Sequence, residues 1–308
     1  MSLIQLLASS PPFLIGACLL LGLIVGSFLN VVIHRLPIML ERQWREQCEE
    51  LLVHDTAAPA AAALEPPSRA AQAPYNLALP PSACPVCKTP ITALQNIPII
   101  SYVLLKGRCA SCRAPISIRY PLVEALATLL SGAVAWRFGF GWPLAGALLF
   151  SWFLLALAVL DLEQQLLPDQ LTYPLLWIGL TFALFPSHDS AVPVDVHSAL
   201  LGAICGYLSL WSVYHLFRLV TGREGMGYGD FKLLAALGAW LGWKMLLPII
   251  LLASVVGAII GALMLRARGA SRSTPIPFGP FLAGAGWLVW MLGPRLVRHY
   301  LPLLTPYP

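Results

Sequence analysis

The chain has 308 residues, of which 58% are hydrophobic and only 11% are charged, and its formal net charge is +5. Soluble globular domains carry roughly 25% charged residues, so this composition excludes an ordinary soluble protein. The apolar residues come in long blocks without the alternation of β-strands, which disfavours a membrane β-barrel. We therefore expect an all-α polytopic membrane protein.

Eight apolar segments are candidates for transmembrane helices. A span requires roughly 20 residues, so the length of each segment matters. The first lacks a preceding basic region and a following cleavage site, so we expect a retained span and not a signal peptide. The sixth is short, which predicts a broken helix or one that merges with its neighbour. The segments are 13–33, 121–136, 142–160, 171–186, 197–218, 231–243, 246–265 and 281–301.

The sequence predicts three parts: a first transmembrane helix (1–33), a loop (34–120) and a transmembrane domain (121–308). Most Lys and Arg residues fall in segments that are cytoplasmic if the N-terminus lies outside, so the positive-inside rule places the loop in the cytoplasm. The positive charge therefore indicates topology and not nucleic-acid binding. The loop opens with a helical pattern at 34–53. An Ala- and Pro-rich stretch at 54–74 follows, which we expect to be a flexible linker.

Two CxxC motifs lie in the loop, with the spacing C-x2-C-x21-C-x2-C. Four thiolates at such spacing can bind Zn²⁺ tetrahedrally, and four sulfur ligands leave no open position for catalysis. The 84–112 module is too small to fold on its own core, so metal binding would supply its folding energy. Two disulfides are the alternative, which a reducing cytoplasm disfavours. The predicted ligands are Cys84, Cys87, Cys109 and Cys112.

Acidic side chains are scarce in the apolar part of the chain, where an unpaired charge is expensive. Asp161 ends one apolar run and Asp230 begins another, and the predicted topology puts both at the inner membrane face. Two carboxylates at equal depth can form an aspartic-protease pair. One is ionised and activates a water, while the other keeps its proton, because proximity and low dielectric separate their pKa values.

The loop GMGYGD places Gly225, Gly227 and Gly229 before Asp230. Glycines would let the loop adopt positive φ and let a substrate backbone approach closely. The alternative is that the acids only cap helices at the interface. Capping is also the role that we expect for Asp169. A phosphate-binding loop is disfavoured, because no strand precedes the glycines and an acid stands where a phosphate would bind.

Several motifs jointly resemble the type IV prepilin leader peptidases and N-methyltransferases, a family of GxGD-type aspartic membrane proteases that also serves type II secretion. The resemblance runs through nearly the whole chain and includes the paired CxxC motifs. The other motifs are GSFLNVVIHRLP (26–37), RYPLVE (119–124), LDLEQQLLPD (160–169), GMGYGDFKLLAALGAWLGW (225–243) and PFGPFLA (277–283). One departure is Glu163, where many members of the family place a second aspartate.

The resemblance implies a multi-pass enzyme of the bacterial inner membrane, with Asp161 and Asp230 as the catalytic residues. The implied substrates are prepilins and pseudopilins, for type IV pili and type II secretion, cut at the cytoplasmic face after the glycine that ends a short basic leader. The new N-terminal residue, usually Phe, is then methylated from S-adenosylmethionine. The cysteine loop of the family corresponds to 84–112, in agreement with the spacing argument for zinc.

The site of methyl transfer is poorly indicated, because no strand–GxGxxG–helix unit is present. Candidate residues are Asn30, Arg35 and Glu124, each of which could equally fix helix ends. A transporter or channel is an alternative function, but the acids lie at one face and no repeated halves are visible. A scaffold whose cysteine loop docks secretion partners is another, and it would tolerate loss of Asp161 or Asp230. The sequence does not indicate an oligomeric state.

Overall fold

A computed structural model describes residues 2–55, 74–92, 94–185, 194–223, 225–268 and 277–300. The described residues form helices and loops, and among them only two isolated β-bridges and no strand occur. The expectation of an all-α protein is therefore confirmed. The predicted linker at 54–74 lies almost entirely outside the described residues.

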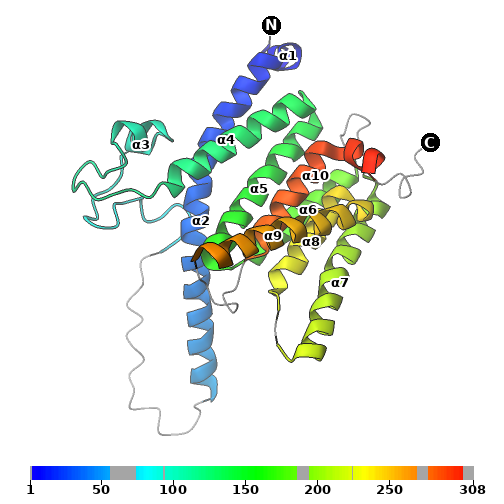
Figure 1. The fold of residues 1–308 in the computed structure, drawn as a ribbon. Coiled ribbons are helices and arrows are strands. Elements are labelled where there is room, and N and C mark those ends of the chain that lie inside the picture. Colours follow the sequence, from blue (N-terminus) through cyan, green and yellow to red (C-terminus); the bar gives the residue numbers. More distant parts are fainter. Residues whose placement is uncertain are drawn as a thin grey trace. The chain divides into compact units, whose positions relative to one another are not determined.

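Figure 1 shows the helices in chain order, and the chain divides into two compact units whose boundaries fall within α2 and α4. One unit spans 24–125, and the other combines 1–23 with 126–308. The α-helices are α1 (Leu3–Ser9), α2 (Pro11–Asp55), α3 (Ile100–Leu104), α4 (Arg119–Phe138), α5 (Trp142–Gln164), α6 (Asp169–Ala183), α7 (Val196–Thr221), α8 (Tyr228–Leu241), α9 (Leu246–Arg268) and α10 (Gly279–Tyr300). Short 3₁₀ turns lie at Leu94–Asn96 and Trp243–Met245.

Each of the eight predicted segments overlaps a helix, but eight membrane spans are not confirmed. Among the described residues, four helical stretches are long and apolar enough to cross a membrane, and a shorter apolar helix covers Gly279–Gly293. Helices α6 and α8 have only 15 and 14 residues, less than the roughly 20 that a span requires. The four long stretches are Pro11–Leu51, Trp142–Gln164, Val196–Thr221 and Trp243–Met264.

Local signals account for where the helices of the larger unit begin and end. Asp195 caps α7, since its carboxylate accepts the Ser198 N–H at 3.3 Å. The same helix stops at Gly222, whose φ of 68° suits glycine. Helix α8 ends at Gly242, where φ is 76°. Helix α5 ends at Gln165, which takes a left-handed conformation with φ 53° and ψ 38°.

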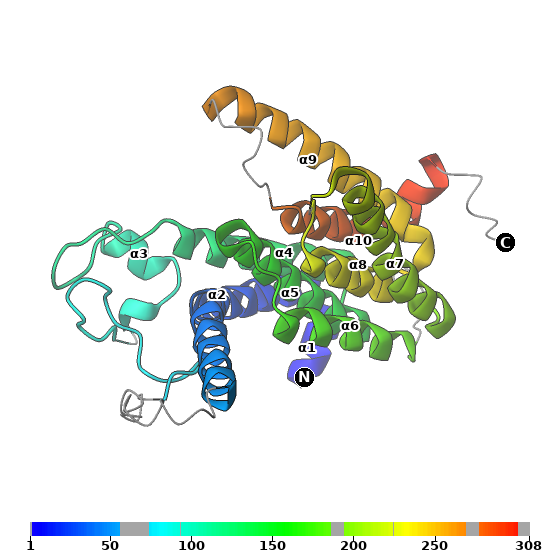
Figure 2. The same ribbon diagram turned by 90° about the horizontal axis from the view of Figure 1, so that it is seen from below.

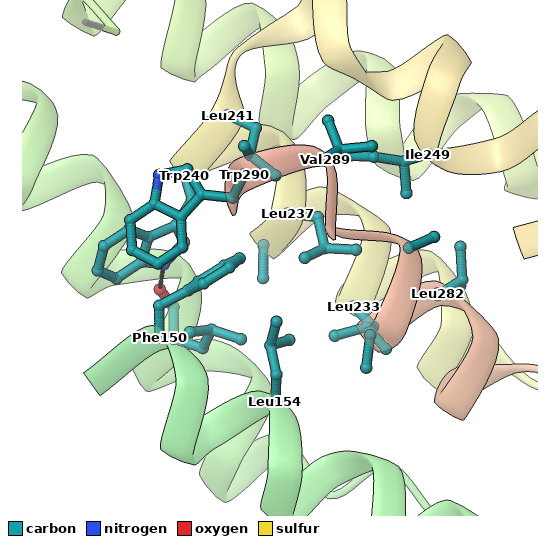
Figure 3. Close-up of a cluster of buried hydrophobic side chains, with 14 of the residues drawn as sticks. Phe150, Leu154, Leu233, Leu237, Trp240, Leu241, Ile249, Leu282, Val289 and Trp290 are labelled. Atoms are coloured by element: carbon teal, nitrogen blue, oxygen red, sulfur yellow. Dashed lines mark hydrogen bonds between the residues drawn. The ribbon is translucent and has the colours of Figure 1, made fainter. Parts of the chain in front are cut away.

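A core of buried apolar side chains joins α5, α8, α9 and α10 (Figure 3). The Phe150 ring meets Trp290 edge-on at 4.4 Å between centroids and lies 5.0 Å from Trp240. Lipid tails are as apolar as these side chains, so helix association inside a membrane depends on close packing and not on a hydrophobic driving force. The interlocked aromatic rings supply this packing beside the helices that carry the two aspartates.

Helices α7 and α8 lie side by side (Figure 2), and Gly202 of α7 faces Gly238 of α8. A methyl group on Gly202 would lie 2.2 Å from the carbonyl oxygen of Gly238, and one on Gly238 would lie 2.1 Å from that of Gly202. Small residues at a helix crossing permit this contact between backbones. The crossing therefore fixes α8, and with it Asp230 in the first turn of α8.

Candidate functional site

Asp161 lies in the last turns of α5 and is buried, with 6% of its surface exposed. Its Oδ2 accepts a hydrogen bond of 2.9 Å from the backbone N–H of Gly279, the first residue of α10. Asp161 is inside a helix and not at its start, so N-terminal capping does not explain its presence. Its carboxylate is instead held by a segment more than 100 residues away.

Asp230 lies in the first turn of α8 and is 7% exposed. Its Oδ1 is buried without a hydrogen-bond partner among the described residues. Gly227 occupies the N-cap position of α8, and no side-chain hydrogen bond caps this end of the helix. The carboxyl groups of Asp161 and Asp230 are near enough to interact electrostatically. The structure therefore brings together the two acids that the sequence singles out.

The glycines before Asp230 differ from expectation in one respect. None of Gly225, Gly227 and Gly229 has a positive φ, so the prediction of a left-handed loop is wrong. A methyl group on Gly227 would meet nothing within 4 Å, whereas one on Gly229 would lie 2.6 Å from the Cβ of Leu167. Gly229 is therefore needed for close packing, whereas Gly227 has open space beside it.

Leu167, in the connection between α5 and α6, lies against a glycine next to each side of the acidic pair. It is 8% exposed and packs against Gly229, which precedes Asp230. A methyl group on Gly279, the residue that binds Asp161, would lie 3.2 Å from the Cδ1 of Leu167. This apolar side chain therefore packs against the glycines next to both carboxylates.

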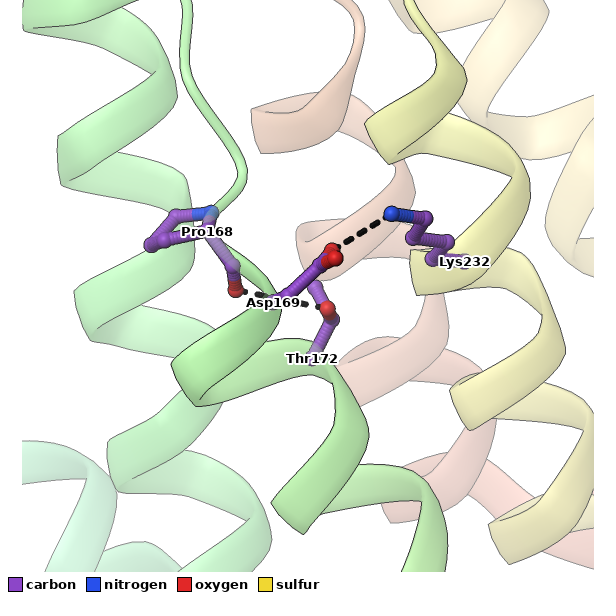
Figure 4. A network of polar contacts seen from close by, with 4 residues as sticks. All are labelled: Pro168, Asp169, Thr172 and Lys232. Carbon is purple, nitrogen blue, oxygen red and sulfur yellow. Dashed lines mark hydrogen bonds and ion pairs between the residues drawn. The ribbon is translucent and has the colours of Figure 1, made fainter. Parts of the chain in front are cut away.

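A polar contact also joins α6 to α8 (Figure 4). The Nζ of Lys232 lies 2.5 Å from the Oδ1 of Asp169 and 5.2 Å from the centroid of the Tyr173 ring. Asp169 occupies the first turn of α6, where an acid is favoured, but its hydrogen bond goes to Lys232 and not to the helix N-terminus. Asp169, the expected cap of α6, therefore forms an ion pair between α6 and α8.

The four predicted metal ligands converge in the smaller unit, with their Sγ atoms all within 4.8 Å of one another. The Sγ atoms of Cys84 and Cys112 are 3.8 Å apart, and those of Cys87 and Cys109 are 3.9 Å apart. Disulfide sulfurs are about 2.05 Å apart, so these cysteines are free thiols. Sulfurs at about 2.3 Å from a tetrahedral Zn²⁺ are about 3.8 Å from one another. The donor set therefore fits such an ion.

The two CxxC motifs adopt the same local structure. The residue after each second cysteine, Lys88 or Arg113, has a φ near 60° (58° and 61°). Its N–H donates to the carbonyl oxygen of the first cysteine, Cys84 or Cys109, at 2.9 and 3.0 Å. Each turn closes with an isolated bridge, Ala83–Pro90 or Arg108–Pro115. This repetition, CPVCKTPI and CASCRAPI, is visible in the sequence but too short to be recognised there as a structural repeat.

The environment of Cys87 favours the thiolate form that metals bind. The side chain and the backbone of Thr89 hydrogen-bond its sulfur and lower the pKa of Cys87 to about 6. The Sγ of Cys87 lies 3.2 Å from the hydroxyl oxygen of Thr89. Thiolates, not thiols, ligate metal ions. The pKa of Cys112 in the same cluster is instead raised to about 11, so the metal assignment rests on the geometry of the four sulfurs.

The three candidates for methyl transfer are buried in the smaller unit, where they hold loop backbone. Arg35 donates from Nη1 to the carbonyl of Asn76 at 2.9 Å and from Nη2 to that of Pro80 at 2.7 Å. Asn30 donates from Nδ2 to the carbonyl of Tyr120 at 2.9 Å, while its Oδ1 is buried without a partner among the described residues.

Glu124 supports an unusual backbone conformation. Its Oε2 accepts the N–H of Ile99 at 2.7 Å, and the side chains of Ser27 and Asn30 also hydrogen-bond its carboxylate. Ile99 has a φ of 57°, which is unfavourable for a β-branched residue. Residues held in such a conformation are enriched at functional sites. Glu124 therefore holds the backbone at Ile99, the residue that precedes α3.

Comparison with known proteins gives two family matches. Residues 20–138 match the model of the bacterial peptidase A24 N-terminal domain, and residues 148–262 match that of the type IV leader peptidase family. No solved structure matches the chain.

Curated relatives match over nearly their whole length and are named prepilin leader peptidase/N-methyltransferase. The Pseudomonas aeruginosa relative is 54% identical over 98% of both chains, and the Stutzerimonas stutzeri relative is 53% identical over 98% of both. A Legionella pneumophila relative is 45% identical over 96% of this chain and 97% of its own. With both halves of the chain matched in this way, the protein belongs to the type IV leader peptidase family.

Proposed function

We propose that this membrane protein cleaves the basic leader from type IV prepilins and pseudopilins and then methylates the new N-terminal residue, usually Phe. The observation that carries the peptidase proposal is the pair of buried, interacting carboxylates, Asp161 on α5 and Asp230 on α8. The names of the full-length relatives support the same substrate class and both activities. A transporter is disfavoured, because the acids lie at one predicted membrane face and the sequence has no repeated halves.

Hydrolysis by this pair follows a balanced sequence of proton transfers. One carboxylate takes a proton from water as the water oxygen attacks the scissile carbonyl carbon, and the other carboxyl group gives its proton to the carbonyl oxygen. The resulting diol returns one hydroxyl proton to the second group. The C–N bond then breaks, and the leaving amine takes the proton held by the first group. Open space beside Gly227 would let the substrate backbone reach the pair.

We place this reaction at the cytoplasmic face of the inner membrane. The Lys and Arg distribution supports a cytoplasmic loop at 34–120 and a catalytic domain at 121–308, with the first helix (1–33) as an anchor. The hydrophobic segment of the substrate would stay in the bilayer while its leader junction reaches the acids.

The cysteine cluster is proposed to be a structural zinc site. Cys84, Cys87, Cys109 and Cys112 would hold the ion, because their spacing fits tetrahedral sulfur ligation. When bound, zinc supplies folding energy to the loop between the two turns. The four sulfurs fill the coordination sphere, so the cleavage steps above involve none of these residues.

Methyl transfer is proposed to use Asn30 and Glu124, with S-adenosylmethionine supplying the methyl group. The unpartnered Oδ1 of Asn30 offers a buried acceptor to a polar group of the donor. Glu124 keeps Ile99 in its strained conformation beside it. Both Nη atoms of Arg35 already bind backbone carbonyls, so its part is to position the loop around this site.

The direct experiment incubates purified protein with a prepilin, with and without S-adenosylmethionine. We expect a product cut after the leader glycine and, with the donor present, a product heavier by one methyl group. Glu124→Gln should bind radiolabelled S-adenosylmethionine more weakly and lose methylation, while cleavage continues. An uncut prepilin would reject the peptidase proposal, and unchanged donor binding in Glu124→Gln would reject the proposed donor site.

A further inference from the structure

The motif PFGPFLA is not explained by the acidic pair alone. Its glycine, Gly279, is the first residue of α10, and its N–H donates to the Oδ2 of Asp161 at 2.9 Å. Helix α10 packs along α5, which carries Asp161. The motif therefore reaches the acidic pair through one backbone amide.

In the first turn of α10, the N–H of Gly279 donates outside the helix, while the following residues cannot do so. Pro280 has no N–H. The N–H groups of Phe281 and Leu282 both donate to the carbonyl oxygen of Phe278, at 3.1 and 3.2 Å. The partial positive charge of a helix N-terminus is carried by such amides. In α10 it is directed at Asp161 through Gly279.

The same position has no room for a side chain. A methyl group on Gly279 would lie 2.6 Å from the Oδ2 and 3.1 Å from the Cγ of Asp161. Real Cβ atoms do not approach other atoms so closely, so the carboxylate would have to move. Gly279 therefore fixes both the position of the carboxylate and its hydrogen bond.

We propose that Gly279 is a positioning residue that holds Asp161 ionised, as the group that takes the proton from water. An N–H donor stabilises the ionised form of a carboxylate. The Oδ1 of Asp230 has no such donor among the described residues, so Asp230 is the partner that keeps the proton. This proposal rests on the peptidase function proposed above.

The first test compares Gly279→Ala with Gly284→Ala in the same helix, where a methyl group would meet nothing within 4 Å. Both variants are assayed for prepilin cleavage, with thermal unfolding as the check on folding. Gly279→Ala should lower kcat by about 10- to 100-fold at unchanged KM, the range expected for losing one hydrogen bond to a charged group. Gly284→Ala should cleave normally. Normal kcat in Gly279→Ala would overturn the proposal.

A second test removes only the amide hydrogen. Glycolic acid at position 279, introduced by suppressor-tRNA translation of the full chain, replaces the N–H by an ester oxygen and adds no side chain. The same fall in kcat at unchanged KM is expected, and an unchanged kcat would show that the hydrogen bond has no such role. Asp161→Asn is run alongside. If it still cleaves, the peptidase assignment itself fails, whereas an inactive Asp161→Asn with normal residue-279 variants rejects only the role of Gly279.

Discussion

Gly227 and Gly229 flank the same tyrosine, yet they meet different surroundings. A methyl group at Gly229 would overlap Leu167 at 2.6 Å, and one at Gly227 would meet nothing within 4 Å. Overpacking of this kind costs about 1–3 kcal/mol. We expect Gly229→Ala to lower the free energy of unfolding by that amount and Gly227→Ala to leave it nearly unchanged. Thermal unfolding in detergent measures both, and equal stability of the two variants would refute the packing role of Gly229.

The cysteines allow a similarly matched comparison. Cys112 belongs to the sulfur cluster, whereas Cys48 is exposed and is not part of it. We expect Cys112→Ser to lose bound zinc, because the ion loses one of four sulfur ligands. Cys48→Ser should keep it. Metal analysis of the purified variants gives the answer, and full zinc content in Cys112→Ser would argue against ligation by this residue.

At the scale of single residues, the sequence predicts side chains whose chemistry is unusual for their place. Asp161 and Asp230 stand out as acids beside apolar runs, and the cysteines stand out by spacing. The contact from Gly279 to Asp161 could not be predicted, because it depends on how α10 packs on α5. The packing of Leu167 against Gly229 and Gly279 could not be predicted for the same reason, because one leucine among many in an apolar chain does not stand out.

Helices α6 and α8 are joined near the acidic pair by the ion pair of Asp169 and Lys232. Their side chains are 46% and 24% exposed, so the pair is only partly shielded from solvent. Such pairs contribute roughly 0.2–1 kcal/mol. We expect Asp169→Asn and Lys232→Met each to lower stability within that range, with the loss reduced in high salt.

A charge exchange separates the attraction from other effects of these substitutions. The double variant Asp169→Lys with Lys232→Asp should recover part of the stability that either single reversal loses, because it restores an ion pair between the helices. Thermal unfolding of all four proteins completes the cycle. Strictly additive losses would show that the two residues do not interact.

At the scale of helices, apolar runs predict where helices occur better than they predict how many cross a membrane. Each predicted segment overlaps a helix, but α6 and α8 are short, with Gly242 ending α8. The predicted helical pattern at 34–53 belongs to α2, which continues without interruption from Pro11 to Asp55. The side chains of α2 change from apolar to polar along its length while the backbone stays helical. Composition alone therefore does not reveal that this is one helix.

For the whole molecule, the two proposed activities fall in different compact units. Asp161 and Asp230 belong to the unit formed by 1–23 and 126–308, whereas the cysteines, Asn30 and Glu124 belong to 24–125. The two family matches, 148–262 and 20–138, fall largely along the same division. This arrangement leads us to expect that variants in one unit spare the activity of the other.

The most direct measurement is prepilin cleavage by purified wild type, Asp161→Asn and Asp230→Asn. Glu163→Gln serves as the matched control, because Glu163 lies two residues from Asp161 on the same helix but is exposed. Each protein is first checked for folding and zinc content. We expect both Asp variants to be inactive and Glu163→Gln to cleave normally. Near-normal cleavage by a folded Asp161→Asn or Asp230→Asn would show that the buried pair is not the catalytic site.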